Sequence, residues 1–203
     1  MQGSEVREFA PRRTTACHLW AATTLLTLAL HAQAAPVQSR FEPTLRAEQG
    51  QALVLHGAGT RFRTVLRVYD LALYTPKQTH SREALINGNQ PCRLEFVALR
   101  ELGSTDIGLA FIKGMKANAT REQVTRHLPA MSQLVDIFSS RQKLAEGDRF
   151  GMEYVPGKGT IFRIDGHPHG QPVGDAEFFR LVLGIWLGDS AVEPLLRDAL
   201  LGL

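Results

Sequence analysis

The order of secondary-structure patterns along the chain is the strongest constraint on its fold. Strand patterns, rich in β-branched and aromatic residues, occur in two blocks: 52–55, 62–74 and 93–99, then 149–155 and 160–165. Helical patterns cover 81–88, two helices between Ser104 and Phe138, then 176–187 and 192–201. Because strands and helices are grouped and do not alternate singly, the sequence predicts an α+β fold with an antiparallel sheet.

Local signals place several turns and helix ends. His56-Gly57-Ala58-Gly59 predicts a flexible turn between the first two strands, and Asp165-Gly166 predicts a tight hairpin turn. Thr120, with Gln123 three residues later, is typical of a capping box that opens the second of the middle helices. Pro129 lies inside that helix, which predicts a kink there.

Residues 1–34 have the pattern of a secretory signal peptide. Arg12 and Arg13 precede the mostly apolar stretch 19–30, and Ala32-Gln33-Ala34 supplies small residues for cleavage. Twelve residues are too few to cross a bilayer, which takes about 20. We therefore expect cleavage after Ala34, a single domain over 35–203, no stable membrane anchor, and a periplasmic or secreted protein.

Composition excludes several classes of protein. A formal net charge of +3, with 20 acidic residues interspersed, is too weak and too mixed for a dedicated nucleic-acid binder. After cleavage only Cys92 remains, so no internal disulfide is expected, and the absence of a Cys-His signature favours a small core residue. The motifs GxGxxG, GxxxxGK, HExxH and GxSxG do not occur.

Four segments, in the same order, resemble the chalcone isomerase superfamily. They are Leu-His-Gly-Ala-Gly-Thr-Arg at 55–61, Val-Tyr-Asp-Leu-Ala-Leu-Tyr at 68–74, Tyr-Val-Pro-Gly-Lys-Gly-Thr at 154–160 and Gly-Ile-Trp-Leu-Gly-Asp at 184–189. The sequence is most similar to the bacterial chalcone-isomerase-like branch of exported proteins, over roughly residues 50–203. The resemblance implies an open-faced antiparallel β-sandwich with helices packed on one face, and a ligand cleft between sheet and helices.

The resemblance also implies a set of site residues. Arg61 stands where true chalcone isomerases have the arginine that stabilises developing negative charge. Tyr69 replaces a threonine of that site, Thr120 and His127 replace a tyrosine and an asparagine, and Leu196 lies near the last hydroxyl. With the other positions replaced and only the arginine kept, chalcone cyclisation is not expected.

Arg61 with Tyr69 resembles the plant fatty-acid-binding branch of the superfamily, which keeps the arginine and has tyrosine for threonine. A guanidinium pairs with a carboxylate through two hydrogen bonds, and a phenol adds a third donor. If residues 61–69 form one strand, their even separation places both side chains on one face. The sequence thus predicts non-catalytic binding of a fatty acid or other small apolar acid, with Arg61, Tyr69, Thr120 and His127 as the ligand-binding residues.

Other interpretations remain open at this point. One is an isomerase or intramolecular lyase acting on an enone-like substrate, with Arg61 as the oxyanion stabiliser. In a purely structural interpretation, Arg61 forms a salt bridge, Tyr69 is a core aromatic, and His127 is a satisfied histidine. No cofactor is indicated; an apolar cofactor such as haem, held by His127, is a weaker alternative. His167 and His169 lack an evident third metal ligand, so no metal site is expected.

Overall fold

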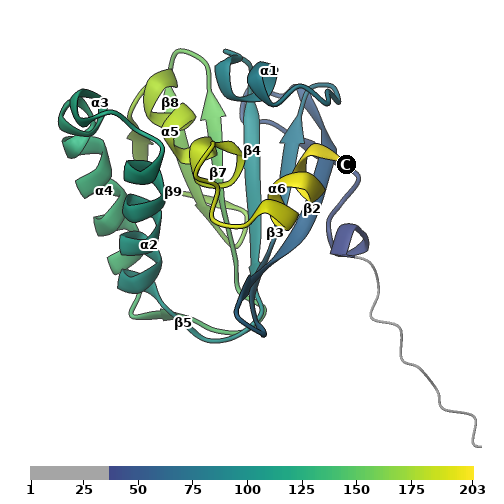
Figure 1. Cartoon of the computed structure of the whole chain (residues 1–203), viewed down its shortest axis with the longest axis horizontal. Helices are drawn as coiled ribbons and strands as arrows, with labels where there is room; N and C mark the ends of the chain where they lie inside the picture. Colours follow the sequence, from purple (N-terminus) through teal and green to yellow (C-terminus); the bar gives the residue numbers. More distant parts are fainter. Residues whose placement is uncertain (1–36) are drawn as a thin grey trace, which may run out of the picture. The chain divides into compact units, whose positions relative to one another are not determined.

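A curled sheet of seven antiparallel strands is the framework of the domain (Figure 1). The computed structural model describes residues 37–203, and within them the sheet order is β1-β2-β3-β4-β7-β8-β9. The strands are β1 Thr44–Arg46, β2 Ala52–Arg63, β3 Leu66–Thr75, β4 Cys92–Ala98, β7 Arg149–Val155, β8 Gly159–Ile164 and β9 His167–Val173. A separate ladder joins β5 Leu102–Gly103 to β6 Lys143–Leu144. The predicted antiparallel α+β fold is confirmed.

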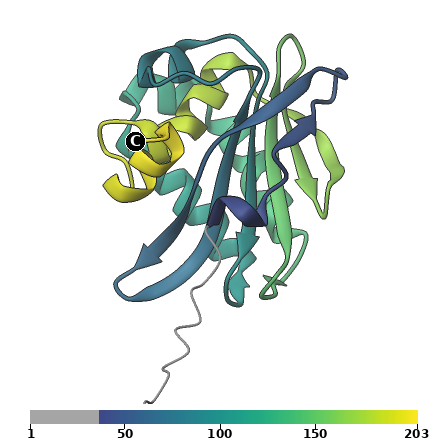
Figure 2. The same cartoon turned by 90° about the vertical axis from the view of Figure 1, so that its right-hand side faces the viewer.

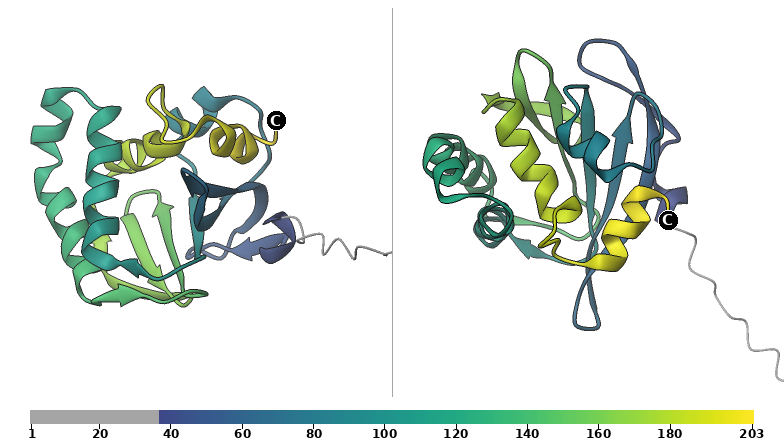
Figure 3. Two further views of the ribbon diagram at one scale, coloured as in Figure 1. Left: turned by 60° about the horizontal axis from the view of Figure 1, so that its bottom comes forward. Right: turned by 45° about the horizontal axis from the view of Figure 1, so that its top comes forward.

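The larger helices pack on one face of this sheet, as the two views of Figure 3 show. The helices are η1 Val37–Arg40, α1 Arg82–Asn87, α2 Ser104–Ala117, α3 Arg121–Arg126, α4 Leu128–Ser139, α5 Ala176–Leu187 and α6 Pro194–Leu201. In Figure 2, η1 lies in front of the sheet, on the side opposite α2 and α5, and leads into the edge strand β1. The fold therefore has a helical layer on one face and a thin N-terminal cover on the other.

Capping explains where the helices begin. Thr120 Oγ1 accepts a hydrogen bond from the Gln123 amide, and the Gln123 side chain accepts one from the Thr120 amide, so the predicted capping box is confirmed. The predicted kink at Pro129 is wrong, because the chain breaks at His127 and a new helix, α4, begins. Pro129 lies in the first turn of α4, where its missing N–H has no helical partner to lose.

The first two long strands differ from the sequence prediction. His56 to Gly59 is not a turn but the middle of β2, and the chain reverses at Thr64 and Val65. The glycines serve close packing: a Cβ on Gly57 would lie 2.3 Å from the carbonyl oxygen of Ala199 in α6. A Cβ on Gly59 would lie 2.8 Å from Leu196 Cδ1. Glycine at these positions lets α6 lie directly against the strand.

The two faces of the sheet are buried by different means. Toward the helices, Phe96 of β4 packs on Phe150, Phe111 and Trp186 in an apolar core. On the opposite face, a smaller apolar cluster around Tyr74 is accompanied by four buried charged residues. Together with the exposed Glu48 they form what we call the outer ion-pair network. Its members are Glu48, Arg93, Glu95, Glu153 and Arg163.

Three further predictions concern Cys92, membrane-spanning helices and the signal peptide. Cys92 is buried at the start of β4, and burial raises the pKa of its thiol to about 12, in keeping with the predicted core role. None of the described helices is long and apolar enough to cross a membrane. The predicted signal peptide, residues 1–34, lies outside the described residues.

The close approach of α6 to β2 gives a test of the fold. Gly57→Ala should lower the free energy of unfolding by about 1–3 kcal/mol, because its methyl group would collide with the α6 backbone. Gly108→Ala in α2 is the matched control, since its methyl group would meet neighbours only at 3.5 Å and beyond. The control should be neutral or stabilising by up to about 1 kcal/mol. Urea unfolding followed by circular dichroism measures both, and equal stabilities would contradict the packing argument.

Candidate functional site

Arg61 and Tyr69 face each other across the hairpin formed by β2 and β3. They are direct partners in the antiparallel register, whereas the shared face expected from the sequence assumed that residues 61–69 form one strand. The prediction of a shared strand is wrong because Thr64 and Val65, which carry no strong turn signal, reverse the chain between them. The two side chains nevertheless share a face, since opposite residues of an antiparallel ladder do so.

Tyr69 presents a protonated phenol at the inner face of the sheet. Its ring packs edge-on against Phe96 with centroids 5.4 Å apart, and its oxygen accepts a hydrogen bond of 3.0 Å from Trp186 Nε1–H. Burial raises the pKa of Tyr69 to about 12, although Trp186 and Arg61 act in the opposite direction. Among residues 37–203 the Tyr69 O–H has no acceptor of its own. At neutral pH the group is therefore a free hydrogen-bond donor.

Arg61 already has a carboxylate partner within the chain. Its Nη1 donates to Glu193 Oε2 at 2.9 Å, and the backbone amide of Phe62 donates to the same oxygen at 2.9 Å. Glu193 directly precedes α6, so it satisfies the charge that the sequence prediction had assigned to a bound ligand. Only Nη1 of Arg61 is engaged in the described chain. Its Nε and Nη2 leave one edge of the guanidinium free for a second carboxylate.

Both residues line a cavity of about 360 Å³. The hairpin of β2 and β3 forms one wall, the segment 100–103 and the first turns of α2 form another, and the end of α5 closes it. Apolar groups supply much of the lining: Val68, Leu102, Ile107, Ala110, Phe111, Ile185, Trp186 and Val192. The cavity is at the lower end of the range of about 300–1,000 Å³ that small-molecule sites occupy.

The charges around the cavity differ in how they are paired. Arg63 and Arg100 line it and form no ion pair with any residue of 37–203, and both are exposed. Glu101 is bound to Lys143 at 2.7 Å. Sequence reasoning missed Arg100, which lies in a connecting segment without a motif. Trp186, in the 184–189 segment that carried the family resemblance, is a buried core residue that also lines the cavity and donates to Tyr69.

Thr120 and His127 do not reach this cavity. Thr120 Oγ1 caps α3, and His127, buried between α3 and α4, bonds through Nε2 to Glu177 Oε2 at 3.0 Å. Hydrogen bonds from His127, Arg126 and Gln123 lower the pKa of Glu177 to about 2. Glu177 and Trp186 are nine residues apart on α5, which is about 13 Å along a helix axis. The structure thus brings together Arg61 and Tyr69 and places the other two predicted residues elsewhere.

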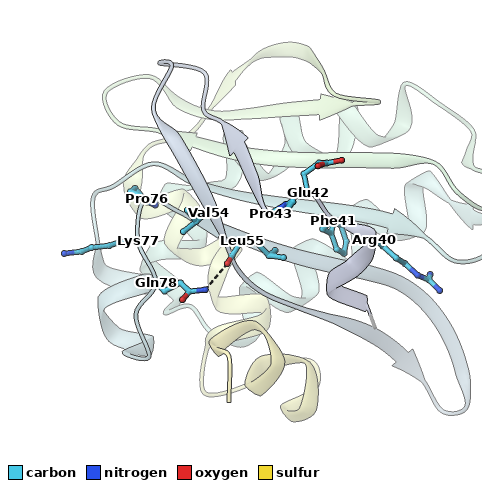
Figure 4. Close-up of a pocket in the computed structure, with 9 residues that line it drawn as sticks. All are labelled: Arg40, Phe41, Glu42, Pro43, Val54, Leu55, Pro76, Lys77 and Gln78. Carbon is cyan, nitrogen blue, oxygen red and sulfur yellow. Dashed lines mark hydrogen bonds between the residues drawn. The ribbon is translucent and has the colours of Figure 1, made fainter. Parts of the chain in front are cut away.

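A second and wider hollow lies between the η1–β1 segment and residues 76–78 (Figure 4). Its volume is about 830 Å³. Arg40 there is paired with Asp70 at 2.9 Å, and the Gln78 side-chain amide donates to the carbonyl oxygen of Leu55 at 3.2 Å. Lys77 points away from the hollow in Figure 4. Because its polar groups are engaged or directed outward, the cavity at Tyr69 is the stronger candidate site.

Comparisons with known proteins agree with this architecture. A solved structure of a fatty-acid binding protein from Arabidopsis thaliana superimposes with a TM-score of 0.59, at 13% sequence identity, and covers 78% of this chain and 95% of its own. At that identity the likeness is one of fold. No curated protein matches the sequence. The profile of the family described as chalcone isomerase-like matches residues 36–202. The chain therefore belongs to the chalcone isomerase-like family.

Proposed function

We propose that the protein binds a small apolar carboxylic acid, such as a fatty acid, in the cavity at Tyr69 and does not transform it. The observation that carries this proposal is the pair of unused donors at one end of an apolar space. The Tyr69 O–H and the Nε and Nη2 edge of Arg61 have no acceptor within residues 37–203. A ligand carboxylate would accept from both, while its hydrocarbon part would contact Phe111, Ile185 and Trp186.

Glu193 is a positioning residue in this arrangement. By engaging only Nη1 of Arg61 and the Phe62 amide, it holds the guanidinium in place and leaves the opposite edge available. Arg63 and Arg100 add positive charge at the cavity, and Glu101 and Asp106 add negative charge, so selection of an anionic ligand would rest on the free donors of Arg61 and Tyr69. The Arabidopsis structure with the same fold is described as a fatty-acid binding protein, which supports the same class of ligand.

The protonation state of Tyr69 supports binding without catalysis. A general base works best when its pKa is near the working pH, and the pKa of Tyr69 is raised to about 12 by burial. The phenol is therefore a donor that stabilises a bound anion and is poorly suited to accept a proton. The cavity lining contains no histidine or cysteine, and its two carboxylates are Glu101, which is bound to Lys143, and Asp106, which is exposed.

The binding site can be tested by titrating a fatty acid and the matching fatty alcohol. Arg61→Ala should weaken acid binding tenfold or more, because losing a charge-assisted partner costs about 1.5–3 kcal/mol, and Tyr69→Phe should weaken it a few-fold. Alcohol binding should change far less, since burial of the chain, about 0.8 kcal/mol per CH₂, is kept. Isothermal titration calorimetry measures all of these affinities.

Glu193→Gln is the matched control for that titration. It removes the carboxylate charge but keeps the guanidinium, and the glutamine amide oxygen can still accept from Arg61 Nη1 and the Phe62 amide, so acid binding should be retained or strengthened. If Glu193→Gln weakens acid binding as much as Arg61→Ala, or if acid and alcohol lose equally, Arg61 is structural and the proposed site is wrong.

We expect no chalcone isomerase activity. The hydroxyl-bearing positions of that site are replaced here by Tyr69, His127 and Leu196, and only Tyr69 lies at the cavity. Loss of chalcone absorbance, followed in the presence of the protein, should occur at the uncatalysed rate. Saturable cyclisation that disappears in Arg61→Ala would instead assign the cavity to an isomerase.

We further propose that the protein is exported, on the basis of the basic, apolar and small-residue regions within residues 1–34. Amino-terminal sequencing of the protein from an expressing bacterium should begin at Ala35. A secreted or periplasmic form that retains Arg12 and the apolar stretch would contradict cleavage at this site.

A further inference from the structure

The end of the hairpin between β2 and β3, residues 62–67, is exposed throughout; we call it the hairpin tip. In the right-hand view of Figure 3 it extends beyond the rest of the domain. It carries three large apolar side chains, with exposed fractions of 83% for Val65, 53% for Leu66 and 39% for Phe62. Three exposed apolar side chains within six residues make the hairpin tip a candidate interaction site.

Both faces of the hairpin tip have the same chemistry. The register pairs Phe62 with Arg67 and Arg63 with Leu66, and paired residues share a face. Each face therefore presents one large apolar side chain and one arginine. A strand pair that covers a core is apolar on one face only, so this arrangement is suited to entering an apolar medium end-on.

The unpaired arginines and the residues of the turn also suit the hairpin tip to contact with an apolar medium. Arg63 and Arg67 form no ion pair or side-chain hydrogen bond with any residue of the described chain, 37–203. At the turn, Thr64 has a φ of +58°, in the left-handed region that β-branched residues disfavour. Asn-Gly is the favoured pair for a two-residue hairpin turn, whereas this chain has Thr-Val and so places Val65 at the apex.

We propose that the hairpin tip docks the protein on the surface of an anionic lipid bilayer. Val65 and Leu66 would enter the boundary between headgroups and acyl chains, while Arg63 and Arg67 extend their guanidinium groups to lipid phosphates. A protein partner is a weaker fit, because stable protein interfaces use about 20–30 residues on each side and the tip has six. The inference goes beyond the proposed ligand and does not depend on it.

The position of the tip adds a functional consequence. Arg63 belongs both to the hairpin tip and to the lining of the cavity at Tyr69. Docking through the tip would therefore hold this side of the cavity close to the bilayer, where apolar acids partition.

The test is sedimentation of the purified full chain with vesicles of phosphatidylcholine alone or of an equimolar mixture with phosphatidylglycerol. The chain should bind the anionic vesicles more tightly, and high salt should weaken that binding. Arg63→Gln with Arg67→Gln should reduce the partition coefficient about fivefold for each arginine, about twenty-five-fold for the pair. Val65→Ser with Leu66→Ser should reduce it about tenfold or more.

The matched control is Arg121→Gln with Lys158→Gln, which removes two exposed charges from α3 and from the β7–β8 turn, at the other end of the sheet. Its binding should equal that of the unmodified chain, and all variants share residues 1–36.

Equal binding to both vesicle types, or an equal loss in the control, would overturn the proposal. So would a dimer in analytical ultracentrifugation that Val65→Ser with Leu66→Ser dissociates while lipid binding is unchanged. Calorimetry with a soluble fatty acid separates this proposal from the ligand site, because Val65→Ser with Leu66→Ser should leave that affinity unchanged.

Discussion

The contact between α6 and β2 determines the geometry of the candidate site. Gly57 and Gly59 allow the helix to lie directly on the strand, where any side chain would collide with Ala199 or Leu196. Because Glu193 immediately precedes α6, this contact brings its carboxylate to Arg61 and to the Phe62 amide. Gly57 and Gly59, which suggested a turn in the sequence, thus help to orient the Arg61 guanidinium at the cavity.

Charge is distributed in two distinct ways across the sheet. On the outer face, Glu153 is fully buried and pairs with both Arg93 and Arg163, at 3.5 Å and 3.3 Å, so these charges satisfy each other. A buried carboxylate requires such partners, since desolvation would otherwise be prohibitive. Arg63 and Arg100, at the cavity, have no ion pair within residues 37–203. The contrast separates arginines that hold the fold together from those available to a ligand or a surface.

Patterns that depend on neighbouring residues were predictable from the sequence, and contacts between distant segments were not. The capping box at Thr120, the grouped order of strands and helices, and the strand 149–155 follow from local chemistry and are confirmed. The hairpin turn at Thr64 was not predicted, because Thr-Val carries no turn signal and the residues around it are good strand formers. The Arg61–Glu193 pair spans 132 positions, and only the packing of α6 on β2 brings it about. His127 had the spacing expected from the family, but its bond to Glu177 depends on where α5 lies.

The unrecognised turn accounts for both the site and the hairpin tip. Reversal at Thr64 and Val65 makes Arg61 and Tyr69 cross-strand partners, which places a cation and a phenol side by side on the face that lines the cavity. The same reversal leaves residues 62–67 beyond the cover of the helices, so that Phe62, Val65 and Leu66 are exposed. An Asn-Gly turn at these two positions would bury as much apolar surface in the core and would expose less apolar surface at the tip. Thr64, with a φ of +58°, strains the backbone at this turn, and the lipid contact proposed for the tip would account for the apolar residue at its apex.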